Sequence, residues 1–447
     1  MELQDVAENM FLPLPGVPPI LITKTQGVYL EDISGLRIID ASGGPMAVTI
    51  GYGRKEVANA AAKALEEVSY LLPVFASRAR IELVKRIKRR LPDMLSHVYF
   101  CSGGSEANEA AVKFARQYQV LCGRKSKYKV ISRRLSYHGM TLLALSISDI
   151  KSRQRDFQPM LWNSPKIEAC YCYRCAFNDR YPECGLKCAS ALEQKILEEG
   201  PDTVAAFIAE PIVASAGGGL VPPPEYFKLI RDICDRYHVV FIVDEIVTGF
   251  GRTGKNMAMD HFDVIPDIVT FAKGVSSGYA PLAGMAVKDD MAAVFSSSGA
   301  EFQHLYTFSA HPIACAVGNE VQRIIEEENL ISQAEKTGQY LQEQLTALMD
   351  LPMVGDIRGK GMLWAVEFVK DKKTREPFEK EFNLKMNLIT TCMLKGVFFY
   401  PGYYEDALGR GDHILVAPPF IITEEQIDTC MGVLRESILE LNEKYAS

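Results

Sequence analysis

Short runs of β-branched and apolar residues alternate with helix-length segments between about residue 95 and residue 290, and this alternation limits the fold more than any other feature. The runs are HVYFCS, YKVISR, TVAAFIAEP, HVVFIVDE, DIVTFAK and LAGMAV. Segments such as 106–122 and 224–237 carry apolar residues at helical spacing and supply the crossovers. The pattern predicts an α/β fold with a doubly wound, mainly parallel sheet covered by helices on both faces.

The pattern changes after about residue 315. Residues 313–350 read as one long amphipathic helix, GDIRGKGMLWAVEFV reads as a hairpin, and a final helix begins at Glu424. We therefore expect a large domain over residues 61–314, with a cysteine-rich insert at about 168–190. A smaller α+β domain would combine residues 1–60 with residues 315–447.

Composition excludes several classes of protein. Apolar residues make up 48% and charged residues 23%, as in globular chains, and the net charge is −7, from 49 Lys plus Arg against 56 Asp plus Glu. Such a surface does not attract nucleic acid or anionic lipid, so we expect a small-molecule partner. The N-terminus does not read as a secretory signal and no window is long and apolar enough to span a membrane, which favours the cytoplasm.

Two charged residues follow apolar runs in VDEIVTGFGRTG and TFAKGVSSGYAPLAG. Ligands of open α/β sheets gather at the carboxyl ends of the strands, so Asp244 and Lys273 are expected in one crevice. A buried carboxylate facing a lysine suits a cofactor that has a basic ring nitrogen and an aldehyde. Pyridoxal phosphate has both, because lysine forms a Schiff base with its aldehyde and aspartate keeps its ring nitrogen protonated.

A phosphate group needs a cradle of backbone N–H groups, and CSGGSEANEAAVKFA supplies one. Gly104 permits close approach of the backbone, and Ser105 adds a hydroxyl where the helix begins. Further along, YHGMT places Tyr137 and His138 just after a strand, where the tyrosine can stack on a flat ring.

SGGSEANEAAVK, YHG, AEPI, VDEIVTGFGRTG, FAKG and HLYTFSAHP, in this order, resemble the class III pyridoxal-phosphate-dependent aminotransferases. The resemblance covers nearly the whole chain. It implies the fold of type I pyridoxal-phosphate transferases, a ping-pong transfer of an amino group from an amine donor to a 2-oxo acid acceptor, and a homodimer with composite active sites.

The resemblance also assigns roles to single residues. Lys273 would be the Schiff-base lysine and proton shuttle, Asp244 the partner of the ring nitrogen, and Ile246 would lie under the ring face opposite Tyr137. The remaining implied contacts are Gly104 and Ser105 to the phosphate, His138 beside the ring, Glu210 at the ring hydroxyl and the substrate side, and Thr307 to the phosphate in the neighbouring subunit.

Two positions bear on the substrate. Met46 stands where many amine-using members carry a tryptophan, so the pocket is expected to accept a longer or branched donor. Arg410, in DALGRGDHILVAPP, occupies the neighbourhood where the family places a mobile arginine that pairs with a carboxylate or swings away. A solvated loop arginine is the alternative.

The reaction stays open in its substrates. The expected donor is an ω- or β-amino compound, with amino acids and their acyl-CoA thioesters among the candidates, and the acceptor is 2-oxoglutarate or pyruvate. The alternatives are an aminomutase of the glutamate-1-semialdehyde type, which needs no keto acid, and a taurine-type amine:pyruvate aminotransferase.

Five cysteines are clustered in the insert: Cys170, Cys172, Cys175, Cys184 and Cys188. Thiolates at short spacings can close a structural zinc site, but this spacing matches no common zinc ribbon. We expect no catalytic metal, and free or redox-labile thiols in preference to a structural one.

Overall fold

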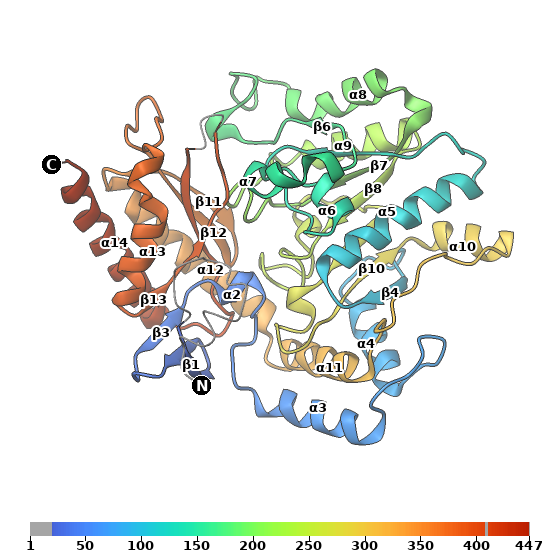
Figure 1. Cartoon of the computed structure of the whole chain (residues 1–447), viewed down its shortest axis with the longest axis horizontal. Coiled ribbons are helices and arrows are strands. Elements are labelled where there is room, and N and C mark those ends of the chain that lie inside the picture. Colours follow the sequence, from blue (N-terminus) through green and yellow to red (C-terminus); the bar gives the residue numbers. More distant parts are fainter. Residues whose placement is uncertain (1–19, 407–409, 447) are drawn as a thin grey trace.

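The computed structural model describes residues 20–406 and 410–446, which form two lobes around three sheets (Figure 1). The first nineteen residues of the predicted segment 1–60 lie outside the described residues, as does the stretch considered for a secretory signal. Within the described ranges, no helix has both the length and the apolar character required to cross a bilayer.

The larger lobe contains a seven-stranded sheet in the order β4-β10-β9-β8-β7-β5-β6. Its strands are β4 (His97–Cys101), β5 (Lys129–Arg133), β6 (Lys166–Ile167), β7 (Val204–Ala209), β8 (Val240–Asp244), β9 (Ile268–Phe271) and β10 (Ala283–Val287). Of these seven strands, β10 alone runs antiparallel to the other six. The prediction of an α/β fold with a mainly parallel sheet is confirmed, and all six predicted strands are present.

Helices cover both faces because side chains alternate along each strand. On β7, Phe207 and Ala209 pack with helices α8 (Lys187–Glu199) and α9 (Tyr226–Arg236). The intervening Ala206 and Ile208 pack with α5 (Gly104–Leu121) and α10 (Asp289–Ser298). Every residue of β7 is therefore buried, as in the strands of doubly wound sheets.

The second lobe combines the two ends of the chain. Its first sheet has the order β1-β2-β3-β13, with β1 (Ile22–Gln26), β2 (Tyr29–Asp32), β3 (Arg37–Asp40) and β13 (Val397–Phe398). Its second has the order β11-β12-β15-β14, with β11 (Val354–Lys360), β12 (Leu363–Phe368), β14 (Tyr400–Pro401) and β15 (Asp412–Val416). The predicted hairpin is β11–β12. Domain boundaries near residues 60 and 314 stay a prediction.

The predicted helix over 313–350 is wrong in one respect, because the chain forms two helices there. α11 (Pro312–Glu327) and α12 (Leu330–Thr346) are separated at Asn329, which has a left-handed φ of 52°. α11 packs on α3 (Lys55–Glu67) and α4 (Arg78–Lys88), whereas α12 packs on α14 (Glu424–Ala446) of the second lobe. Apolar spacing continues on both sides of the break, so periodicity alone does not reveal it.

Four further α-helices lie within the described residues. They are α2 (Gly43–Met46), α6 (Leu142–Ser146), α7 (Lys151–Gln154) and α13 (Leu384–Leu394). Figure 1 shows α2 between the two lobes, where the chain passes from the smaller sheet toward the larger one.

Candidate active site

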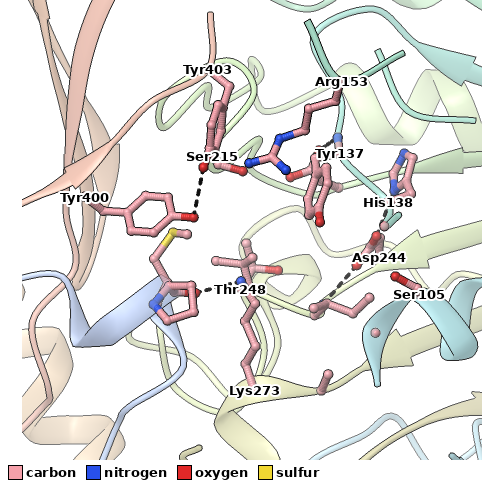
Figure 2. A pocket seen from close by; sticks show the side chains of 18 residues that line it. Ser105, Tyr137, His138, Arg153, Ser215, Asp244, Thr248, Lys273, Tyr400 and Tyr403 are labelled. Carbon is pink, nitrogen blue, oxygen red and sulfur yellow. Dashed lines mark hydrogen bonds and ion pairs between the residues drawn. The ribbon is translucent and has the colours of Figure 1, made fainter. Parts of the chain in front are cut away.

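A cavity of about 270 Å³ lies where the carboxyl ends of the sheet strands meet the second lobe. Its walls are built by residues that follow β4, β5, β7, β8 and β9, by α2, and by the segment that contains β14. They are Pro45, Met46, Gly104, Ser105, Tyr137, His138, Gly139, Arg153, Glu210, Ser215, Asp244, Ile246, Val247, Thr248, Ala272, Lys273, Tyr400 and Tyr403 (Figure 2).

Asp244 is the last residue of β8, and its buried carboxylate is oriented by three donors. Oδ2 accepts hydrogen bonds from His138 Nδ1 at 2.7 Å and Asn108 Nδ2 at 2.8 Å, and Oδ1 accepts one from Ile246 N at 3.0 Å. Thr270 Oγ1 in turn donates to Asn108 Oδ1 at 2.8 Å. The network leaves the carboxylate with one fixed orientation at the cavity wall.

Lys273 follows β9 in a tight turn with a φ of 40°. Its Nζ donates to the carbonyl oxygen of Pro45 at 2.7 Å. Burial lowers the pKa of Lys273 to about 8, against the opposing effects of Asp244 and Glu210. The amine is thus more often neutral near physiological pH than that of a surface lysine, as a nucleophile or proton carrier requires.

Glu210 follows β7, and its carboxylate is held by two backbone donors. Tyr137 N donates to Oε1 at 3.0 Å, and Ala214 N donates to Oε2 at 3.1 Å. Burial raises the pKa of Glu210. The residue therefore fixes Tyr137 at the cavity wall and can itself take up a proton there.

The N-terminus of α5 forms an anion cradle. A Cβ atom added at Gly104 would lie 2.9 Å from Ile246 Cδ1, and one added at Gly139 would lie 2.3 Å from Ser105 Oγ. Met140 N donates to the same Ser105 hydroxyl at 3.0 Å. Only glycines at these two positions keep the backbone N–H groups close to the space in front of the helix.

The structure brings most of the predicted site residues to this one cavity. Those on its walls are Met46, Gly104, Ser105, Tyr137, His138, Glu210, Asp244, Ile246 and Lys273. Thr307 and Arg410 are not among the lining residues. Thr307 lies on the exposed segment 305–308, where its carbonyl oxygen accepts a hydrogen bond from the Tyr70 hydroxyl.

Arg410 is engaged with carboxylates. Its backbone N and Nε donate to the two carboxylate oxygens of Asp406 at 2.9 and 3.1 Å. Its Nη1 lies 3.9 Å from both Glu376 and Glu379. A role for Arg410 in holding a substrate carboxylate stays a prediction.

Arg153, one residue before the end of α7, was not singled out from the sequence. Its guanidinium carbon lies 4.5 Å from the ring centre of Tyr403, and Figure 2 shows the group between Tyr403 and Tyr137. Among the residues that the structure describes, no ion pair joins Arg153 to a carboxylate. KSRQRDF carries several charged residues, and nothing in their spacing distinguishes this arginine from its neighbours.

Tyr400 and Tyr403 were also missed. They belong to the second lobe, and their hydroxyl oxygens lie 3.3 Å apart on the cavity wall. The clustered aromatics of YPGYY are the one signal that could have marked this segment.

The cavity fits the expected cofactor. It offers an anion cradle at Gly104 and Ser105, a carboxylate for a ring nitrogen at Asp244, and an amine of lowered pKa at Lys273. His138 Nε2 is buried and has no hydrogen-bond partner among the described residues, which leaves it available beside the ring site.

Comparisons with known proteins agree with this geometry. Residues 14–438 match the family described as aminotransferase class-III. A putrescine–pyruvate aminotransferase of Pseudomonas aeruginosa is 37% identical over 421 residues, which is 94% of this chain and 90% of that protein. A diaminobutyrate–2-oxoglutarate transaminase of Halomonas elongata is also 37% identical, over 92% and 88% of the two chains. The solved structure of a thermostable (S)-enantioselective omega-transaminase from Thermomicrobium roseum is 36% identical, with a TM-score of 0.93 over 98% of each chain.

Proposed function

Because this chain belongs to the class-III aminotransferases, pyridoxal-phosphate-dependent enzymes of fold type I, we propose that it transfers the amino group of an ω-amino compound to a small 2-oxo acid. The observation that supports a 2-oxo acid as acceptor is Arg153, a cation without a carboxylate partner among the described residues, set in a wall of tyrosines in the same cavity as Lys273.

Four residues would hold the cofactor. Gly104 and Ser105 would bind its phosphate, Asp244 its ring nitrogen, and Lys273 its aldehyde carbon. When bound, pyridoxal phosphate supplies a carbonyl that captures the donor amine and a ring that takes up the electrons released when a proton is removed. Each of these contacts uses a group that the structure already orients.

Lys273 moves the proton. With its pKa lowered to about 8, the Nζ amine is neutral in about one molecule in ten at pH 7, far more often than an ordinary lysine, and accepts the proton from the donor carbon. The hydrogen bond to Pro45 O keeps Nζ at the floor of the cavity. In the second half of the cycle the same atom returns a proton on the acceptor side.

Arg153 would receive the carboxylate of the 2-oxo acid. A guanidinium binds a carboxylate through two parallel hydrogen bonds, and its contact with the Tyr403 ring holds it at the cavity edge without neutralising it. In this structure Arg410 donates to Asp406 instead. Arg153 and Arg410 are therefore two alternative candidates for binding the acceptor carboxylate, and single variants can distinguish them.

The donor side is apolar and aromatic. Met46, Tyr137, Tyr400 and Tyr403 surround the space beyond Lys273. Such walls suit the methylene chain of an ω-amino compound. The putrescine specificity named for the relative from Pseudomonas aeruginosa agrees with this choice.

A homodimer is part of the proposal. The segments 70–75 and 305–308 expose large apolar side chains, and the rings of Tyr70 and Phe308 lie 6.4 Å apart. They form one patch that a second copy of the chain would cover. Thr307 lies within this patch, so its hydroxyl would face a second copy, as its expected role at the neighbouring subunit's phosphate requires.

The free state of all eleven cysteines supports a cytoplasmic location.

A half-reaction screen tests the substrate class. Purified yellow holoenzyme is mixed with single amines in the absence of any 2-oxo acid, and loss of the yellow colour and release of the carbonyl product are followed. We expect ω-amino acids and diamines to release one carbonyl product per site and then stop until pyruvate or 2-oxoglutarate is added. Continuous turnover of one compound without a 2-oxo acid would instead identify an aminomutase.

A further inference from the structure

The cysteine-rich insert has no role in the chemistry described above, yet its thiols lie close together. Cys172, Cys175, Cys184 and Cys188 line one small cavity of about 20 Å³, room for about one water molecule. Cys170 and Cys172 also line a larger, more open cavity next to it. Among the described residues, no three His, Cys, Asp or Glu side chains are arranged to hold a metal ion.

Three of these residues form what we call the thiol cluster: Cys170, Cys172 and Cys188. The thiol of Cys170, 4% exposed, lines the open cavity together with Cys172, and Cys188 packs against the apolar cluster that contains Cys170. Cys172 is exposed to solvent at the start of a short 3₁₀ turn, Cys172–Arg174. An accessible thiol thus lies two residues from a buried one, on the wall of the same cavity.

This proximity makes Cys172 the reactive member. The hydrogen bond from Cys170 lowers the pKa of Cys172 to about 7, whereas the pKa of Cys170 is raised. The thiolate is the nucleophilic form of cysteine, so the exposed member is substantially ionised near neutral pH. Cys188 also has a lowered pKa, but it is less exposed.

We propose that Cys172 and Cys170 are a redox modification site, at which a peroxide converts the two thiols into one disulfide. The Cys172 thiolate attacks one peroxide oxygen, the O–O bond breaks, and with one proton taken up a sulfenic acid and water form. The Cys170 thiol then attacks the Cys172 sulfur, the S–O bond breaks, and a second water leaves. Two thiols are oxidised by two electrons and one hydrogen peroxide is reduced to two waters.

The residue between the two cysteines connects this site to the substrate cavity. Tyr171 is buried, its hydroxyl donates to Glu367, and its ring meets that of Tyr404 edge-on with centres 5.8 Å apart. Tyr404 directly follows Tyr403, which lines the substrate cavity and contacts Arg153. A bridge across Tyr171 restricts its backbone and therefore acts on the packing of the segment 400–406.

Arginines hold Tyr171 in this position. The Arg358 guanidinium carbon lies 4.7 Å from the Tyr171 ring centre, and Arg358 Nη1 donates to Glu367 at 2.6 Å. Arg174 Nε donates to Glu367 at 2.7 Å. Because these contacts are buried and tightly packed, a displaced Tyr171 cannot be accommodated locally.

Thiol counting and peptide mapping test the modification site. Holoenzyme is treated with a small molar excess of hydrogen peroxide, remaining thiols are alkylated, and peptides are analysed by mass spectrometry with and without prior dithiothreitol. We expect the loss of two thiols per chain, a Cys170–Cys172 bridge, and full recovery after reduction. These readouts do not depend on catalysis, so they stand or fall separately from the proposed function.

Matched variants make the test decisive. Cys172→Ser should lose the bridge and keep the activity of the reduced enzyme, whereas Cys175→Ser, which changes a cysteine outside the thiol cluster, should oxidise as the wild type does. An equal loss of two thiols in Cys172→Ser would overturn the proposal. So would zinc near one equivalent per chain that disappears in Cys172→Ser.

The link to the cavity has its own readout. In the oxidised wild type the KM of the 2-oxo acid should change by roughly twofold or more, and reduction should reverse the change. Oxidised Cys172→Ser should show no such change. An unchanged KM in fully bridged wild-type enzyme would overturn the connection through Tyr171.

Discussion

At the scale of single residues, the site depends on how each charged group is partnered. Asp244 accepts from three donors that orient it, whereas Lys273 has a carbonyl oxygen as its hydrogen-bond acceptor and a lowered pKa. Arg153 and Arg410 differ in the same way, because only Arg410 is engaged by nearby carboxylates among the described residues. The partnering of these groups indicates which are available to substrate and cofactor.

The lowered pKa of Lys273 predicts how the apoenzyme reloads. Only the neutral amine attacks the cofactor's aldehyde, so the rate of uptake should rise with pH and level off above about 8. An ordinary lysine would give a rate that rises to about 10.5. The rate is followed by stopped-flow absorbance when cofactor is added back to the apoenzyme. A plateau only near pH 10.5 would show that burial does not lower the pKa of Lys273.

The same shift predicts a stability change of known sign. Because the folded pKa is depressed below that of the unfolded chain, the unfolded apoenzyme binds more protons between pH 8 and 10.5. The contribution of Lys273 to stability therefore rises with pH through that window. Urea denaturation of the two apoenzymes compares the wild type with Lys273→Met. The free energy of unfolding of the wild type should increase relative to that of the variant as pH rises.

At the scale of elements, the sequence predicts the sheet well and some helix ends poorly. The strands of the large lobe are buried on both faces, so their sequences are continuous apolar runs such as VAAFIA. Such runs indicate a sheet that is covered on both sides. The break between α11 and α12 carries no proline or glycine; its local signal is Asn329, a residue type that tolerates the left-handed conformation, and the helices on either side pack on different partners. Tertiary packing, absent from local pattern, decided that boundary.

The candidate site likewise contains residues that local pattern predicts and residues that only tertiary packing places. Residues that follow strands, such as Asp244 and Lys273, were predictable because a parallel sheet gathers strand ends at one edge. Arg153 and Tyr403 reach the cavity from a short helix and from the second lobe, and their arrival depends on how the lobes pack. No spacing within the chain encodes that contact.

The N-terminus of α5 provides a matched pair of tests. Gly104→Ala would place a Cβ 2.9 Å from Ile246 Cδ1, so cofactor affinity should fall roughly tenfold as Ile246 is pushed into the site. Gly103 has no atom within 4 Å of an added Cβ and has an extended φ of −149°. Gly103→Ala should therefore bind cofactor nearly as the wild type does. Equilibrium dialysis of the apoenzymes measures both, and equal effects would remove Gly104 from the cradle.

At the scale of the whole molecule, the two ends of the chain and the large sheet meet around one cavity. β3 pairs with β13 across more than three hundred residues of sequence, and the segment with Tyr400 and Tyr403 closes the substrate side. The exposed patch at 70–75 and 305–308 lies outside this arrangement, and covering it with a second copy completes the proposed enzyme.

Mixing inactive subunits tests the composite site. If Thr307 serves the neighbouring subunit, a dimer of one Lys273→Ala and one Thr307→Ala chain has both defects in one site and an intact second site. An equal mixture that exchanges freely should then recover about one quarter of the wild-type sites, measured at limiting cofactor. If Thr307 serves its own chain, or if the enzyme is a monomer, mixing recovers nothing beyond the average of the two variants.

The most direct test of the proposed function compares Arg153→Ala with Arg410→Ala on two acceptors, pyruvate and an uncharged aldehyde of similar size. We predict that Arg153→Ala raises the KM for pyruvate roughly ten- to hundredfold, the loss of a charge-assisted pair, and leaves the KM for the aldehyde nearly unchanged. Arg410→Ala should affect both acceptors little. A large, pyruvate-specific effect in Arg410→Ala together with a normal KM in Arg153→Ala would contradict the account.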